Sequence, residues 1–181
     1  MIEYDEHREP DLYSLPSIQR KEHIMPSITP YLWFDNQAEE AASFYASVFG
    51  NSRVVDVQRY GEAGPGPKGT PMVVTFELEG QKFIALNGGP HFTFNEAVSL
   101  YTSCKNQEEV DELWEKLTDG GEPGQCGWLK DKYGLSWQII PTALSDMLSD
   151  PDPDKSNRVM KAMLEMKKID IRALKDAYDG A

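Results

Sequence analysis

Residues 28–50, ITPYLWFDNQAEEAASFYASVFG, combine the two signals that decide the fold. Ile28–Asp35 is rich in aromatic and β-branched side chains, and this composition predicts a strand. The residues that follow place alanine and aromatic side chains at helical spacing on one face, and Gly50 ends the pattern. Asn36, with Glu39 three residues later, resembles a capping box at the start of this helix. The stretch therefore predicts a strand followed directly by a helix.

Three more strands are predicted after this helix, at Arg53–Tyr60, Met72–Leu78 and Gln81–Leu86. The segment Gly61–Thr70 contains glycine and proline residues that favour a loop. The short connection Glu79–Gly80 predicts that the last two strands form a hairpin. The first half of the chain therefore has a β-α-β-β-β pattern.

The same pattern begins again at residues 97–117, AVSLYTSCKNQEEVDELWEKL. A strand at Ala97–Cys104 precedes a helix that Asn106 and Glu109 cap, as Asn36 and Glu39 do in the first half. Shorter strands are predicted at residues 128–130 and 135–140, on either side of the turn 131–134. The chain is thus expected to be an α+β protein with two βαβββ-type repeats, the second shortened by at least one strand.

The ends of the chain differ from this repeated core. Residues 1–26 show no clear period and are interpreted as a loosely ordered extension. Residues 27–141 form the predicted core domain, with one half at about 27–87 and the other at about 96–141. Residues 142–181 are expected to form a helical tail, with helix starts at Asp152–Pro153 and at Asp170.

Composition excludes several classes of function. The formal net charge of −12 argues against binding to nucleic acid or to an anionic membrane surface. No secretory signal begins the sequence, and no apolar run reaches the roughly 18 residues that a membrane-spanning helix needs. Cys104 and Cys126 lack metal-like or redox-like spacing, which favours a reduced, cytoplasmic protein.

Three stretches carry a resemblance to a known family. Residues 28–50 resemble the opening of PhnB-like proteins of the vicinal oxygen chelate superfamily, which includes glyoxalases, bleomycin-resistance proteins and extradiol dioxygenases. Residues 90–117 and 126–155 resemble the branch labelled 3-demethylubiquinone-9 3-methyltransferase. The resemblance covers about residues 27–168. It implies a mixed sheet curled around a cavity that is often completed by dimerisation. We therefore expect a homodimer, and isologous pairing is the commonest arrangement for soluble homo-oligomers.

The resemblance also allows a test for a metal site. Metal-using members of the superfamily take two ligands from each half, and the matching positions here are Thr29, Ala85, Ala97 and Gln138. These side chains lack the thiolate, imidazole and carboxylate groups that bind transition metals well. Within the predicted domain His91 is the one histidine. We therefore expect no metal and no other cofactor.

The same alignment of strands predicts an aromatic-walled pocket with a few polar groups, which is the usual composition of a small-molecule site. An alternative interpretation is that these side chains fill the space between the two halves. The candidate ligand-binding residues are Tyr31, Trp33, Asn87, Ser99, Tyr101, Ser136 and Gln138.

Three functions remain open from the sequence. The first is metal-free binding of a small molecule. The second is an enzyme that acts on a quinone-like aromatic substrate, as the methyltransferase label implies. The third is a metal-dependent enzyme like the glyoxalases and dioxygenases. The glycine cluster at residues 61–69 contains proline and opens no helix, so it does not match the usual S-adenosylmethionine loop. No catalytic residue can be assigned.

Overall fold

The computed structural model describes residues 28–181, so the predicted extension at residues 1–26 lies outside the described residues. The elements of the first repeat are β1 (Tyr31–Phe34), α1 (Ala38–Val48), β2 (Arg53–Arg59), β3 (Pro71–Leu78) and β4 (Gln81–Asn87). Those of the second repeat are β5 (Ser99–Cys104), α2 (Gln107–Thr118), β6 (Glu122–Pro123), β7 (Trp128–Lys130) and β8 (Ser136–Pro141). Three helices follow: α3 (Thr142–Leu148), α4 (Pro153–Leu164) and α5 (Ile171–Asp179).

The two repeats have the same strand order, which confirms the predicted duplication. The first sheet has the order β1-β4-β3-β2 and the second the order β5-β8-β7-β6. In each sheet the first strand runs parallel to the last strand of its repeat, and the other pairs are antiparallel. The predicted hairpin is present, with Glu79 and Gly80 both at positive φ in its turn.

One detail of the predicted fold, the loss of at least one strand in the second repeat, is corrected by the structure. The second repeat keeps four strands, and it is shortened because β6 has only two residues, Glu122 and Pro123. The predicted two-repeat mixed sheet is present as two four-stranded sheets that are not closed on each other. A two-residue strand next to Gly120–Gly121 has too little alternation to be recognised in a sequence.

The start of α1 differs from the expected capping box. The N-cap position is Gln37, and its side chain makes no capping hydrogen bond. Instead Asn87, at the end of β4, accepts a hydrogen bond from the backbone N–H of Ala38 at 2.8 Å. Asn87 lies beside Phe34 in the parallel ladder. Its side chain therefore reaches the unpaired backbone N–H groups at the start of α1, the helix that follows Phe34. In the second repeat Asn106 caps α2 as predicted, by accepting from Glu109 N.

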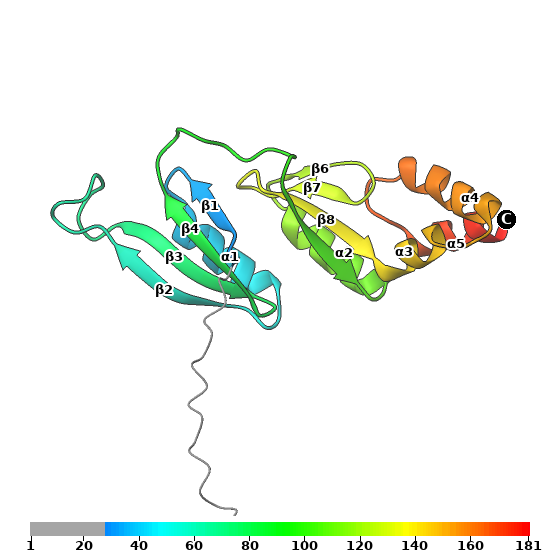
Figure 1. Ribbon diagram of the computed structural model, residues 1–181, viewed down its shortest axis with the longest axis horizontal. Coiled ribbons are helices and arrows are strands. Elements are labelled where there is room, and N and C mark those ends of the chain that lie inside the picture. Colours follow the sequence, from blue (N-terminus) through cyan, green and yellow to red (C-terminus); the bar gives the residue numbers. More distant parts are fainter. Residues whose placement is uncertain (1–27) are drawn as a thin grey trace, which may run out of the picture.

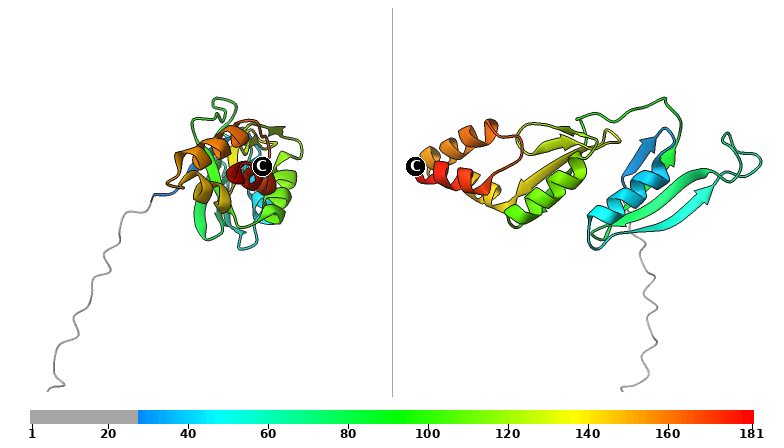
Figure 2. Two further views of the ribbon diagram at one scale, coloured as in Figure 1. Left: turned by 90° about the vertical axis from the view of Figure 1, so that its right-hand side faces the viewer. Right: turned by 180° about the vertical axis from the view of Figure 1, so that it is seen from behind.

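Each repeat buries one face of its sheet under its helix. Viewed from behind, α1 and α2 both lie on the near side of their sheets, and the opposite faces carry no helix (Figure 2). In β1 the buried residues Leu32 and Phe34 alternate with Tyr31 and Trp33, which point to the uncovered face. The repeats therefore lie side by side with their uncovered faces on a common side (Figure 1).

The C-terminal helices form a second hydrophobic core at the end of the molecule far from the first sheet (Figure 1). Its fully buried members include Val159, Ile169 and Leu174. Asp152 and Asp170 cap α4 and α5 as predicted. No helix among residues 28–181 is long and apolar enough to cross a membrane.

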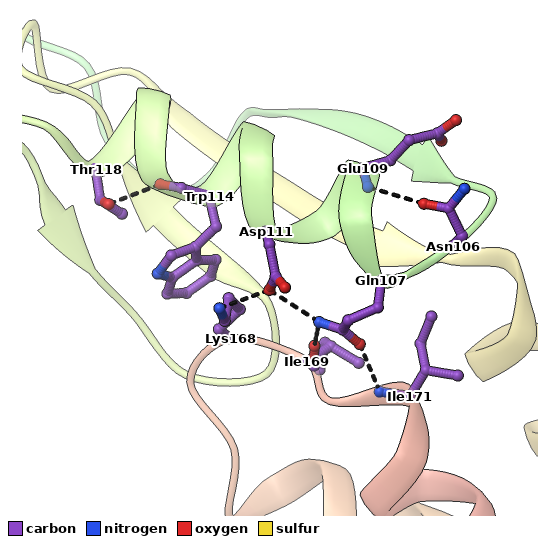
Figure 3. Close-up of polar contacts among 9 residues, drawn as sticks. All are labelled: Asn106, Gln107, Glu109, Asp111, Trp114, Thr118, Lys168, Ile169 and Ile171. Atoms are coloured by element: carbon purple, nitrogen blue, oxygen red, sulfur yellow. Dashed lines mark hydrogen bonds and ion pairs between the residues drawn. The ribbon is translucent and has the colours of Figure 1, made fainter.

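Gln107, in the first turn of α2, joins this helical unit to the second repeat (Figure 3). Its amide nitrogen donates to the carbonyl oxygen of Ile169 and to Asp111 Oδ1, both at 3.0 Å. Its amide oxygen accepts from the backbone N–H of Ile171 at 2.8 Å. Lys168 adds an ion pair with Asp111 at 2.6 Å. One side chain thus satisfies backbone groups on both sides of the start of α5.

Candidate functional site

A buried carboxylate holds the two repeats together. Asp131, in the turn between β7 and β8, is 3% exposed. Its Oδ2 accepts hydrogen bonds from the Tyr45 hydroxyl of α1 and from Trp137 Nε1, both at 2.8 Å. Its Oδ1 accepts from the backbone N–H groups of Tyr133 and Leu135. Burial raises the pKa of Asp131, and these four donors act in the opposite direction. The carboxylate therefore links a helix of one repeat to a strand of the other.

The same turn packs against α1 through aromatic and charged side chains. The Tyr133 ring makes edge contacts with the rings of Phe44 and Tyr45, and its hydroxyl donates to Glu40 Oε1 at 2.8 Å. Lys132 lies over the Phe44 ring at 4.7 Å from its centroid. These contacts fix where the second sheet stands beside α1, because they all come from one four-residue turn.

The junction of the repeats contains a cleft of about 430 Å³. Trp137 of β8 stacks on Phe49, just after α1, with ring centroids 5.4 Å apart, and both rings line the cleft. One wall is the β3–β4 hairpin, with Leu78 and Phe83. The other wall is β5 from Ser99 to Ser103. We call this space the seam cleft. Its lining is mainly aromatic and aliphatic, with hydroxyl groups, one amide and one carboxylate, which suits a small, largely apolar molecule.

The seam cleft exists because two strand edges face each other without pairing. Strand β1 pairs with Ile84–Asn87 and leaves residues 81–83 of β4 without a neighbour on that side. Strand β5 pairs with β8 on its other side. Free backbone groups of both edges therefore border the cleft, and they are available to hydrogen-bond a bound molecule.

The predicted site residues of the second repeat lie in or beside the seam cleft. Ser99 and Tyr101 line it, and Tyr101 is 54% exposed. Gln138 Nε2 donates to Ser99 Oγ at 2.8 Å, so it orients that hydroxyl. Ser136 is 1% exposed, and its Oγ is a buried side-chain oxygen without a hydrogen-bond partner among the described residues. Three of these four side chains are thus connected to the cleft, and Ser136 is covered.

The predicted site residues of the first repeat lie elsewhere. Tyr31 is exposed on the uncovered face of the first sheet and does not line the seam cleft. Trp33 donates through Nε1 to the carbonyl oxygen of Gly89 at 2.8 Å and contacts Phe92 edge-on. Asn87 is buried, and both ends of its amide are used, by Ala38 N and by the carbonyl oxygen of Pro71. The structure therefore does not bring the seven candidates into one site.

Sequence reasoning missed the part of the cleft that the first repeat supplies. Phe49, Leu78, Gln81 and Phe83 line it, yet each reads as an ordinary residue at the end of a helix or beside a hairpin turn. The one available signal is the tight turn at residues 79–80, because it places both hairpin ends at one point. Nothing in the sequence indicates that β5 lies opposite.

The positions that match superfamily metal ligands do not form a site. Ala85 is fully buried under α1, so the register that placed it on the cavity side was wrong. Its neighbours Ile84 and Leu86 point to the uncovered face. The sequence of β4 does not show which face is covered, because apolar side chains lie on both faces. Thr29 precedes β1 and Ala97 precedes β5. Among residues 28–181, no group of three or more His, Cys, Asp or Glu side chains could hold a metal ion. The donor set does not fit a transition metal.

The glycine clusters are occupied by aromatic rings of the chain itself. A Cβ atom on Gly64 or Gly66 would lie within 2.7 Å of the Tyr60 ring. A Cβ atom on Gly88 would lie 2.2 Å from the Trp33 ring. These glycines are required because a ring packs on each of them, and neither cluster is followed by a helix, as the usual S-adenosylmethionine loop is. The residues present do not fit that cofactor in its usual mode.

The cysteines offer no nucleophile at the cleft. Cys104 is fully buried at the end of β5, and burial raises its pKa to about 11. Cys126 is partly exposed, and its backbone N–H donates to the carbonyl oxygen of Met166. The cleft is therefore equipped for contact and hydrogen bonding, and its described residues include no thiolate.

Comparison with known proteins identifies the family. The family model described as 3-demethylubiquinone-9 3-methyltransferase matches residues 26–140. The chain belongs to this family. The match ends before the C-terminal helices, and it confirms the PhnB-like branch that the sequence resembles.

Two solved structures are similar to this family member. A PhnB protein from Bacillus cereus with the same methyltransferase label is 41% identical, with a TM-score of 0.59. The match covers 64% of this chain and 99% of that protein. A protein from Pseudomonas aeruginosa is 20% identical over 65% of this chain and 98% of that one, with a TM-score of 0.54, and it supports the fold alone. No functionally curated protein matches the chain.

Proposed function

We propose that this protein binds a small, largely apolar molecule in the seam cleft and does so without a metal ion. The observation that carries the proposal is the cleft of about 430 Å³ between the repeats, floored by the stacked rings of Phe49 and Trp137. Cavities of this size and composition are typical small-molecule sites. The hydroxyl groups of Ser99 and Tyr101 would orient the ligand by hydrogen bonds.

The neutral fluorescent amine N-phenyl-1-naphthylamine is expected to bind the wild-type protein with one site per chain. Replacing Tyr101 with alanine removes an aromatic wall of the cleft and is expected to weaken binding about fivefold. Phe92→Ala is the control, since Phe92 is an exposed aromatic side chain that lies outside the cleft. A fluorescence titration measures all three affinities.

Equal weakening by both substitutions would contradict binding in the seam cleft, and no binding by the wild type would contradict the proposal as a whole. The same titration after treatment with a chelator tests the metal-free state. Affinity and melting temperature are expected to stay unchanged, because no bound metal would be lost. Elemental analysis that finds about one transition metal per chain would restore the metalloenzyme hypothesis.

Methyl transfer to a quinone-like aromatic molecule is the second candidate. It is favoured by the description of the family that matches residues 26–140. Calorimetry with S-adenosylmethionine tests it directly. Because neither glycine cluster opens a helix, we expect no heat of binding. A saturable signal would show a methyl-donor site of another design.

We also infer that the chain forms a homodimer. Both uncovered sheet faces lie on one side of the molecule. Strand β1, which contains the exposed Tyr31, and strand β5, which the exposed Val98 directly precedes, are edge strands of the two sheets. A second copy packed there would remove this apolar surface from water. Light scattering is expected to give twice the chain mass of 20.4 kDa. A mass of one chain at all concentrations would exclude the dimer.

A further inference from the structure

The seam cleft carries one kind of charge. Among its described lining residues Glu79 is the one side chain that is charged at neutral pH, and no lysine, arginine or histidine lines the space. The whole chain carries a net charge of −12, which adds a negative long-range potential. An anionic ligand would therefore meet repulsion and would find no cationic partner in the cleft.

Glu79, in the hairpin turn, borders the seam cleft and also an adjoining hollow that Lys105 and Lys116 line. Its backbone has φ 47°, in the left-handed region, and its N–H donates to Ser52 Oγ at 3.2 Å. Its Oε1 accepts from the backbone N–H of Asn51, also at 3.2 Å. No ion pair joins Glu79 to a lysine or arginine within residues 28–181. A carboxylate that is fixed in this way and has no ion-pair partner among these residues is available to a cationic ligand.

Aromatic rings beside this carboxylate favour the same kind of ligand. Phe49 and Tyr101 line the cleft, and the faces of such rings attract cations, while the buried ring of Trp137 stacks on Phe49 and supports it. The rings also provide flat apolar surface for a planar group. The negative charge of Glu79 and the aromatic surface of the cleft therefore favour the same kind of ligand, a planar aromatic cation.

Resting on the proposed function, we propose that the ligand of the seam cleft is a planar aromatic molecule that carries a positively charged amine, with Glu79 as its partner. The aromatic part lies between the hairpin and β5. The ammonium group lies at the cleft mouth beside the Glu79 carboxylate. Anionic molecules such as nucleotides and aromatic acids are disfavoured by charge.

Three probes that share a naphthyl ring test this specificity by calorimetry at about 0.1 M salt. They are neutral 2-naphthalenemethanol, cationic (2-naphthylmethyl)trimethylammonium and anionic 2-naphthoate. The cation is expected to bind about fivefold more tightly than the alcohol, and the anion about fivefold more weakly, because partly exposed charge contacts are modest. Glu79→Gln keeps the size of the side chain. It is expected to weaken binding of the cation about threefold and to leave the affinity for the alcohol unchanged.

Glu115→Gln is the matched control, since it makes the same change in net charge on an exposed face of α2 outside the cleft. It is expected to leave all three affinities unchanged. If the alcohol binds but the cation binds no better, the charge specificity is wrong while the proposed function stands. If both glutamine variants weaken the cation equally, the general field and not Glu79 is responsible, which overturns the assignment. If no probe binds, the proposed function itself fails.

Discussion

Replacing Asp131 with alanine is expected to lower the free energy of unfolding by about 3–5 kcal/mol. The change removes the acceptor of four hydrogen bonds and leaves the Tyr45 hydroxyl and Trp137 Nε1 unpaired in the interior. Because these donors come from both repeats, the loss also loosens the floor of the seam cleft. Urea denaturation measures the stability, and the fluorescent amine measures the cleft.

Tyr45→Phe is the control for this prediction. It removes one donor and leaves Asp131 with three, so the expected loss is only about 1 kcal/mol. A loss below about 1 kcal/mol for Asp131→Ala would mean that water replaces the carboxylate at little cost. The buried carboxylate would then not be what joins the repeats.

Gln107→Leu is expected to destabilise the docking of the C-terminal helices by about 1–3 kcal/mol. Leucine has a similar size but cannot bond the carbonyl oxygen of Ile169 or the N–H of Ile171, so both lose their partner (Figure 3). Hydrogen exchange with mass spectrometry should show faster exchange in residues 142–181. Exchange in the first repeat should not change, because the core that it shares with the second repeat is separate from the core of the C-terminal helices.

Lys168→Ala provides the comparison at the same contact. It removes an exposed ion pair with Asp111, which contributes about 0.5 kcal/mol or less. If Gln107→Leu accelerates exchange no more than Lys168→Ala does, the amide of Gln107 is not what docks the helices. Faster exchange in both repeats would instead indicate that the two cores unfold together.

Local pattern was enough to predict most elements of the fold. The strands of the β3–β4 hairpin, the loop before it and the caps Asn106, Asp152 and Asp170 all depend on residues close together in the sequence. The repeated strand and helix also predicted the common order of the two sheets. The candidate site was predicted only in part, since Ser99 and Tyr101 line the seam cleft while Tyr31 and Trp33 do not.

What the sequence determined by itself is therefore the duplicated β-α-β architecture and the family. Only the tertiary structure decided the cap of α1, which comes from Asn87 rather than Asn36, and the partners of Asp131, which include Tyr45 of the other repeat. It also decided the seam cleft, whose walls come from the hairpin and from β5. The physical reason is the range of the contacts: strand and helix periods are set between near neighbours, whereas these hydrogen bonds and this cavity exist only where distant segments meet.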